Sequence, residues 1–176
     1  ALPIFVRRMA DDGVTIVLVE QSVNVALTVA ERAYFMERGT IRFDGPTAEL
    51  LERPDLLRSV FLSSAHSDDD GPTHPDIDLD QAVIDRTESP VLSVTELSVS
   101  FGGIRAVNGA TFDVWPREIV GVIGPNGAGK TTVFDLISGF TPLDEGQIVL
   151  NGRNITSLNS AGRASMGLGR SFQDAR

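Results

Sequence analysis

The stretch "IVGVIGPNGAGKTTVFDLISGF", residues 119–140, decides the fold of the second half of the chain. Residues 119–123 form a short apolar run rich in β-branched side chains, which is typical of a buried parallel strand. Residues 124–131 follow the pattern G-x-x-x-x-G-K-[ST], and residues 131–138 predict a helix that stops at Gly139. A strand, a glycine-rich loop and a helix in this order indicate an α/β fold with a phosphate-binding loop.

The loop carries the residue types that hold a chain of phosphates. Gly124, Gly127 and Gly129 allow a tight turn, so that successive N–H groups and the helix N-terminus point at one anion. Lys130 supplies a positive charge for the β- and γ-phosphates, and the Thr131 hydroxyl can ligate Mg²⁺. The alternative is a glycine-rich turn that binds nothing. It is disfavoured because the full spacing and both flanking elements fit the motif.

Size and composition limit the class of protein. The chain has 176 residues, 41% of them hydrophobic, which suffices for one domain or two small ones. Cysteine is absent, which excludes disulfides and thiolate metal sites and suits a cytoplasmic protein. No apolar run approaches the roughly 20 residues that cross a bilayer, and no signal peptide is recognisable, so we expect no transmembrane segment of its own.

The net charge of −9 is concentrated in residues 63–90. This stretch has eight acidic residues and one base, so the remainder is nearly neutral and nothing indicates a nucleic-acid partner. It is rich in Ser, Asp, Pro and Gly and has no amphipathic period, which predicts an acidic disordered linker. Both histidines, His66 and His74, fall within it, so a loose divalent-cation site is an alternative, although ligands without a rigid frame bind metal weakly.

Before the linker, the pattern predicts alternating helices and strands. Residues 1–10 predict a helix and residues 14–20 a strand, with a turn at Gly13 between them. Ser22 is a candidate cap for a helix that runs through Arg32.

The next segments predict a hairpin and a helix. Residues 33–45 fit two strands about a tight turn at Arg38 and Gly39. Residues 47–61 are helical in pattern, and Pro54 must break or restart that helix.

After the linker, residues 91–101 and 109–115 predict strands. Residues 146–155 predict a hairpin, because Asn151 and Gly152 are a typical hairpin turn pair.

Residues 92–158, together with "GLGRSFQDAR" at 167–176, resemble the nucleotide-binding domain of ABC transporters. They are most similar to the subfamily that powers uptake of branched-chain and other hydrophobic amino acids. By this resemblance, residues 91–176 correspond to the N-terminal part of such a domain, with the A-loop, Walker A and Q-loop segments. "DDGVTIVLVEQSVNVALTVAERAYFMERGTIRFDGPTAELL" resembles the end of such a domain, so residues 1–62 correspond to a C-terminal part.

The order, with a tail before a head, implies a tandem fusion of two ATPase subunits, of which this chain is a middle portion. The implied fold is α/β of the P-loop NTPase (ABC ATPase-like) type. It has a parallel sheet plus antiparallel β hairpins, and it is incomplete because the helical subdomain and the Walker B strand are missing.

The resemblance also implies roles for individual residues. Phe101 falls at the A-loop aromatic that stacks on adenine, with a strand core residue as the alternative. Gln173 falls at the Q-loop, where it would contact Mg²⁺ or the attacking water and sense the membrane partner. Gln21 falls where most of the superfamily has a switch histidine, and glutamine can donate a hydrogen bond but cannot carry a proton's charge. The implied nucleotide-binding residues are Phe101, Gly124, Asn126, Gly127, Ala128, Gly129, Lys130, Thr131 and Thr132, with Thr131 and Gln173 on Mg²⁺.

The carboxylates that hydrolysis requires are not evident. One acidic residue helps to hold Mg²⁺ and another polarises water, and the family places both as Asp-Glu after four apolar residues. No such stretch follows the loop, and the LSGGQ signature is absent as well. Glu20 ends the apolar run 16–19 and is a look-alike. In the family the strand before the H-loop lies beside the strand that leads into the glycine-rich loop, so the two halves can pack as one incomplete sheet. Glu20 would then lie in the H-loop neighbourhood, where its role is either catalytic or structural.

The resemblance implies an ATP-binding component of an ABC importer at the cytoplasmic face of the cell membrane. It would couple hydrolysis of ATP, with Mg²⁺, to uptake of branched-chain or related amino acids through membrane permease subunits, with a second ATPase domain as dimer partner. We expect this chain alone to bind nucleotide weakly and to turn it over poorly or not at all. The alternatives are a circularly permuted soluble P-loop NTPase and a non-catalytic nucleotide-binding or regulatory module.

Overall fold

The computed structural model describes residues 2–20, 26, 28–58 and 87–171. We call residues 1–58 the first half of the chain and residues 87–176 the second half. The elements of the first half are α1 (Leu2–Asp11), β1 (Ile16–Glu20), β2 (Arg32–Glu37), β3 (Thr40–Pro46) and α3 (Thr47–Leu51). Those of the second half are β4 (Leu92–Phe101), β5 (Ile104–Val114), β6 (Ile119–Ile123), α5 (Lys130–Ser138), β7 (Glu145–Leu150), β8 (Arg153–Asn154) and α6 (Ser160–Ser165). No helix within these described ranges is long and apolar enough to cross a membrane.

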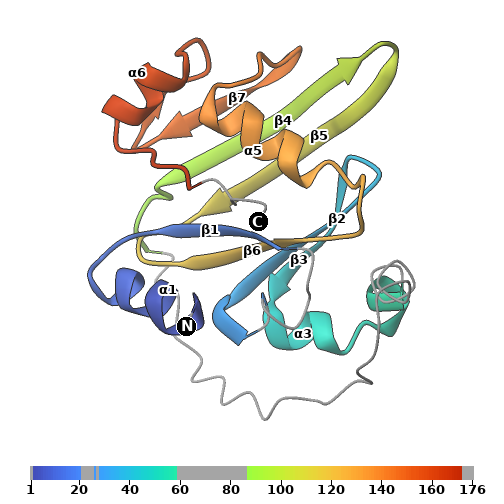
Figure 1. Ribbon diagram of the computed structural model, residues 1–176, viewed down its shortest axis with the longest axis vertical. Helices are drawn as coiled ribbons and strands as arrows, with labels where there is room; N and C mark the ends of the chain where they lie inside the picture. Colours follow the sequence, from blue (N-terminus) through green and yellow to red (C-terminus); the bar gives the residue numbers. More distant parts are fainter. Residues whose placement is uncertain (1, 21–25, 27, 59–86, 172–176) are drawn as a thin grey trace.

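The two halves share one sheet, with strand order β1-β6-β2-β3. Strand β6 runs parallel to both of its neighbours, and β3 returns antiparallel to β2 as a hairpin. The strand that leads into the glycine-rich loop therefore lies between two strands of the first half (Figure 1). This confirms the prediction that the halves pack as one sheet.

The sequence of β6 explains its central place. All five of its residues are buried, as expected for a strand covered on both faces. Val120 and Val122 belong to the cluster that contains α5, whereas Ile119 and Ile123 pack among residues of the first half. Between them, Gly121 is closely packed, because a Cβ there would lie 3.2 Å from the Cβ of Ala30.

The second sheet is antiparallel, with strand order β5-β4-β7-β8. Helix α5 joins the two sheets, because Val133 and Leu136 share one core with Val122 of β6 and Ile148 of β7. Helices α1 and α3 lie on the other side of the first sheet (Figure 1). There α1 contributes Val6 to a separate cluster with Ile119. The fold is thus α/β around the loop strand, with antiparallel hairpins attached.

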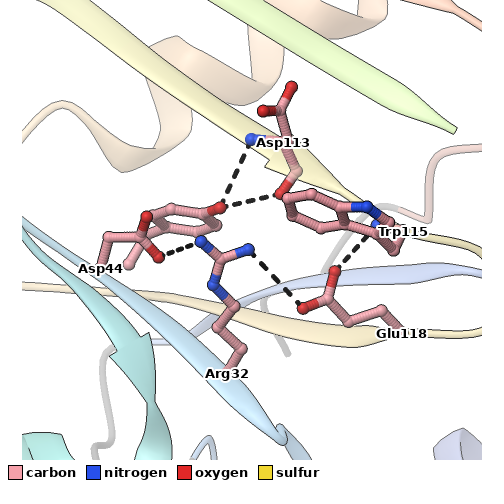
Figure 2. A network of polar contacts seen from close by, with 6 residues as sticks. Arg32, Asp44, Asp113, Trp115 and Glu118 are labelled. Carbon is pink, nitrogen blue, oxygen red and sulfur yellow. Dashed lines mark hydrogen bonds and ion pairs between the residues drawn. The ribbon is translucent and has the colours of Figure 1, made fainter. Parts of the chain in front are cut away.

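A buried polar network also joins the halves (Figure 2). The Arg32 side chain, 6% exposed, forms an ion pair with Asp44 and lies 3.9 Å from an oxygen of Glu118. Its guanidinium lies over two rings, 4.9 Å from the centre of Tyr34 and 5.1 Å from that of Trp115. Residues of both halves therefore surround the Arg32 charge. Contact with two carboxylates and two ring faces at once suits a planar guanidinium better than an ammonium.

Most of the predicted elements are confirmed. Gly13 makes the first turn with φ of 92°, and the turns at residues 38–39 and 151–152 both connect antiparallel strands. Residues 54–58 form a new helical segment after α3, so Pro54 restarts the helix as predicted. The predicted linker lies largely outside the described residues, as does Ser22.

The prediction of a helix through Arg32 was wrong. Residue 29 is the last helical one, and Arg32 already begins β2, paired with Val120. The physical reason is tertiary: the apolar run after Arg32 gains more from burial beside β6 than from continuing the helix.

Candidate nucleotide-binding site

The glycine-rich loop leads directly into α5, and the helix N-terminus is open. Gly129 has a left-handed conformation with φ of 99° and occupies the cap position, where no described side chain caps the helix. The first intrahelical bond runs from the Val133 N–H to the Gly129 carbonyl. The N–H groups of the preceding residues are therefore placed to hold an anion, which the helix dipole also favours.

Lys130 lies within the loop. Its Nζ donates to the carbonyl oxygens of Gly124, at 2.6 Å, and Pro125, at 2.9 Å. Burial lowers the pKa of the Lys130 ammonium, because desolvation disfavours the charged form. A phosphate oxygen at the loop would compensate for this desolvation, so the arrangement suits an anionic ligand.

The other loop residues form an exposed mouth above a buried base. Asn126, Gly127 and Thr131 are exposed, whereas Ala128 is buried and Thr132 is half-buried. An exposed hydroxyl at the start of a helix fits a Mg²⁺ ion that is also bound to phosphates. The part of the chain that the structure describes contains no cluster of three or more His, Asp or Glu residues that could hold a metal by themselves.

Phe101 is the last residue of β4, and it is 51% exposed. The core alternative for this side chain is therefore wrong. Its partner across the hairpin is Ile104, which is 74% exposed. The same hairpin borders the loop, because a Cβ on Gly129 would lie 2.5 Å from the carbonyl oxygen of Ala106. Phe101 therefore lies at the end of the hairpin that contacts the glycine-rich loop.

Glu20 ends β1, and its backbone pairs in register with Ile123, the residue directly before the loop. This confirms the predicted neighbourhood of Glu20, while its catalytic use stays a prediction. Gln21 and Gln173 lie outside the described residues. The chain shortly before Gln173 is tied to α5, since Arg170 Nη1 donates to Asp135 Oδ1 at 2.7 Å.

One part of the site is not predictable from the sequence. The β2–β3 turn of the first half contacts the loop, where the Gly39 N–H donates to the Ala128 carbonyl at 2.9 Å. The glycine itself was predicted to make a turn, but no local pattern shows what that turn would touch. The contact joins residues that are about 90 positions apart in the sequence, so only the tertiary structure reveals it.

Comparison with known proteins agrees with this geometry. Residues 107–176, which begin in β5 and include the whole loop, match the family described as "ABC transporter". Residues 107–176 are similar to part of an ABC transporter domain. The match extends from within β5, the strand that borders the loop, to beyond α6.

Curated relatives match about half of this chain. The high-affinity branched-chain amino acid transport ATP-binding protein LivG of Escherichia coli (strain K12) is 46% identical over 87 residues, which are 49% of this chain and 34% of LivG. BraF of Pseudomonas aeruginosa, which has the same description, is 45% identical over 87 residues, with the same two shares. The chain therefore spans about a third of the length of these relatives.

Solved structures of ABC transporter proteins show a local similarity. MJ1267, an ATP-binding cassette of an ABC transporter, is 30% identical and aligns with a TM-score of 0.48 over 51% of this chain and 35% of that chain. A nucleotide-free ATP-binding cassette from an ABC transporter is 32% identical, with a TM-score of 0.47 over 48% of this chain and 34% of that chain.

Proposed function

We propose that the chain is the nucleotide-binding part of an ATP-driven transporter, and that its loop binds the phosphates of MgATP. The observation that carries this proposal is the open N-terminus of α5 beside the buried ammonium of Lys130. Backbone N–H groups and one positive charge converge there on a space with an exposed mouth. Thr131 would hold Mg²⁺ together with the phosphates, and the metal would neutralise charge on the phosphate chain.

The base of the nucleotide would stack on Phe101. The exposed ring at the end of β4 supports this role, because stacking on adenine would cover apolar surface that water otherwise contacts. Gln173 would reach Mg²⁺ or the attacking water, and Gln21 would occupy the switch position.

The proposed transport role is import of branched-chain or related amino acids. LivG and BraF, which are described as proteins of branched-chain amino acid transport, support this substrate class. The chain would then act at the cytoplasmic face of the membrane with permease subunits and a second ATPase domain. Residues 1–62 would represent the end of one nucleotide-binding domain, residues 63–90 an acidic linker and residues 91–176 the beginning of another.

The first experiment is MgATP binding by the purified chain and by Lys130→Ala. Lys130 is the only lysine in the sequence, so an acyl-phosphate derivative of ATP can acylate just one side-chain amine. We expect Lys130→Ala to weaken MgATP binding by roughly 10- to 100-fold, because a hydrogen bond to a charged group is lost. Mass spectrometry should find the acyl label on Lys130 of the wild-type chain, and excess ATP should suppress it.

The matched control is Arg153→Ala, which removes the same charge from an exposed position on β8. Equal MgATP affinity of the wild type and Lys130→Ala would contradict the proposal. Turnover by the chain alone, lost in Lys130→Ala, would instead favour a permuted P-loop NTPase. One structural observation favours the permuted NTPase: the backbone of Glu20 pairs in register with Ile123, directly before the loop. In that case Glu20→Gln would be the next variant to measure.

A further inference from the structure

The phosphate loop rests on a hairpin of the first half. Gly39, in the turn between β2 and β3, donates its N–H to the Ala128 carbonyl at 2.9 Å. Its own carbonyl accepts a hydrogen bond of 2.8 Å from the Asn108 N–H of β5. Gly39 is therefore fixed on two sides, by the loop and by the strand beside it.

The three backbones meet without side chains between them. A Cβ on Gly39 would lie 2.8 Å from the carbonyl oxygen of Ala106. A Cβ on Gly129 would lie 2.5 Å from the same oxygen and 3.4 Å from the Cα of Gly39. At the start of the loop, a Cβ on Gly124 would lie 2.1 Å from the carbonyl oxygen of Met36, which is in β2. Any side chain at these glycines would force the hairpin and the loop apart.

This contact has a consequence for the donors of the loop. The Ala128 carbonyl and the Gly129 N–H belong to one planar peptide unit and point in opposite directions. When Gly39 holds the carbonyl oxygen, the orientation of the Gly129 N–H is fixed as well. A preoriented donor binds an anion more tightly than one that must be reoriented on binding.

We propose that the Arg38–Gly39 turn is a positioning element of the nucleotide site: it orients the Ala128–Gly129 peptide, so the first half sets the phosphate affinity of the loop in the second half. This inference rests on the proposed function, because it concerns the same loop. It adds that residues far from the glycine-rich loop in the sequence determine how well the loop binds.

The chain contains a matched control for this turn. The β7–β8 turn has φ of 49° at Asn151 and 74° at Gly152, close to the 49° and 80° of Arg38 and Gly39. A Cβ on Gly152, however, would meet nothing within 4 Å. Alanine at either glycine costs similar backbone strain, and only alanine at Gly39 also presses on the strand beside the loop.

The test compares MgATP affinity of Gly39→Ala and Gly152→Ala by calorimetry, at a temperature where circular dichroism shows both variants to be folded. We expect Gly39→Ala to weaken binding by about tenfold, the effect of one misplaced donor to a charged phosphate. Gly152→Ala should bind within about twofold of the wild type, even where its Tm falls. Equal affinities of the two variants would overturn the inference, since a purely structural role lowers Tm without lowering affinity.

A second measurement uses the wild-type chain and does not depend on how Gly39→Ala folds. In hydrogen exchange followed by mass spectrometry, MgATP should slow exchange in peptides covering residues 34–42 as well as residues 120–133. Peptides covering residues 148–154 should not change. Protection of residues 120–133 without any change in residues 34–42 would overturn the inference. Failure of the wild type to bind MgATP at all would overturn the proposed function, and this inference with it.

Discussion

At the scale of single residues, Tyr34 is a buried titratable side chain with well-defined partners. It is 1% exposed, its hydroxyl donates to the Asp113 carbonyl at 2.8 Å, and its ring packs 5.0 Å from that of Phe112. Burial raises the pKa of Tyr34 well above its usual value, with the nearby Arg32 charge acting in the opposite direction. The folded state therefore favours Tyr34 as the neutral, protonated phenol.

This gives a prediction for alkaline pH. Above about pH 10 an unfolded tyrosine loses its proton, whereas folded Tyr34 keeps it. The unfolded state then binds fewer protons, so the free energy of unfolding falls as pH rises, by up to about 1.4 kcal/mol per pH unit. Tyr34 is the only tyrosine in the chain, so the increase in absorbance at 295 nm that accompanies tyrosine ionisation reports Tyr34, over the background of the single tryptophan. We expect its ionisation to coincide with unfolding.

The control is Tyr34→Phe, which should be less sensitive to pH in this range. Lys130 has a lowered pKa and acts with the opposite sign, since the unfolded state holds its proton to higher pH. That contribution is common to both proteins and cancels in the comparison. Ionisation of Tyr34 near pH 10 in a chain that is still folded would contradict the prediction.

Phe101 gives a second prediction at this scale. Phe101→Ala should weaken ATP binding by roughly 1–3 kcal/mol, the range for a base stacked on an aromatic ring. Binding of inorganic triphosphate should not change, because that ligand has no base. The ring is half exposed, so stability should change little. Phe101→Trp should retain ATP affinity, and equal losses for both ligands in Phe101→Ala would argue against stacking.

At the scale of elements, the C-terminal end of α5 depends on a residue from α6. Gly139 ends the helix in a left-handed conformation with φ of 76°. Arg163, 2% exposed, donates through Nη1 to the carbonyls of Leu136 and Ile137, and through Nη2 to that of Thr156 at 2.8 Å. A cation among the last carbonyls of a helix is favoured by the helix dipole. Arg163 therefore fixes α5, and with it the loop at its other end.

We predict that Arg163→Ala destabilises the chain by about 3 kcal/mol, because several buried carbonyls lose a charged donor together. Arg163→Lys should recover only part of this, since an ammonium cannot reproduce the planar fork of a guanidinium. Urea unfolding measures both. As a control, Arg153→Ala at an exposed position should change the free energy of unfolding by less than about 0.5 kcal/mol. A similarly small effect of Arg163→Ala would show that Arg163 does not stabilise the C-terminal end of α5.

At the scale of the whole molecule, neither half is complete without the other. Strand β6 lies between β1 and β2, and the network around Arg32 draws its partners from both halves (Figure 2). Without the first half, β6 would expose two unpaired edges and an apolar face. The halves are therefore parts of one cooperative unit, although they resemble parts of different domains.

The prediction is that residues 87–176 alone remain unfolded or aggregate, and that coexpression with residues 1–58 yields a folded complex. The expected readout is copurification of the two pieces with a single cooperative melting transition. Replacing one partner of a buried ion pair costs about 3–5 kcal/mol of stability. Glu118→Ala in the second piece, which removes a partner of Arg32, should therefore weaken the complex of the two pieces. An independently folded piece 87–176 would show that the halves are separate units.

The local elements of the fold can be predicted from the amino-acid sequence. The loop, its strand and its helix are continuous in the chain, and the turns at Gly13, Gly39 and Gly152 need only a glycine with positive φ. Pro54 likewise restarts its helix for a local reason. Each of these features depends on residues a few positions apart, so a pattern of neighbours suffices to predict it.

The contacts between these elements depend on tertiary packing and cannot be predicted from local patterns. Tertiary packing places Arg32 in a strand beside Val120, so the preceding helix ends before this residue. Phe101 is exposed rather than in the core, and the Gly39 N–H binds the glycine-rich loop at Ala128. The partners in the sheet and at the loop are some 90 residues apart, and backbone groups make the decisive contacts. Such contacts leave almost no trace in side-chain patterns, because any sequence that folds to this geometry supplies the same N–H and C=O groups.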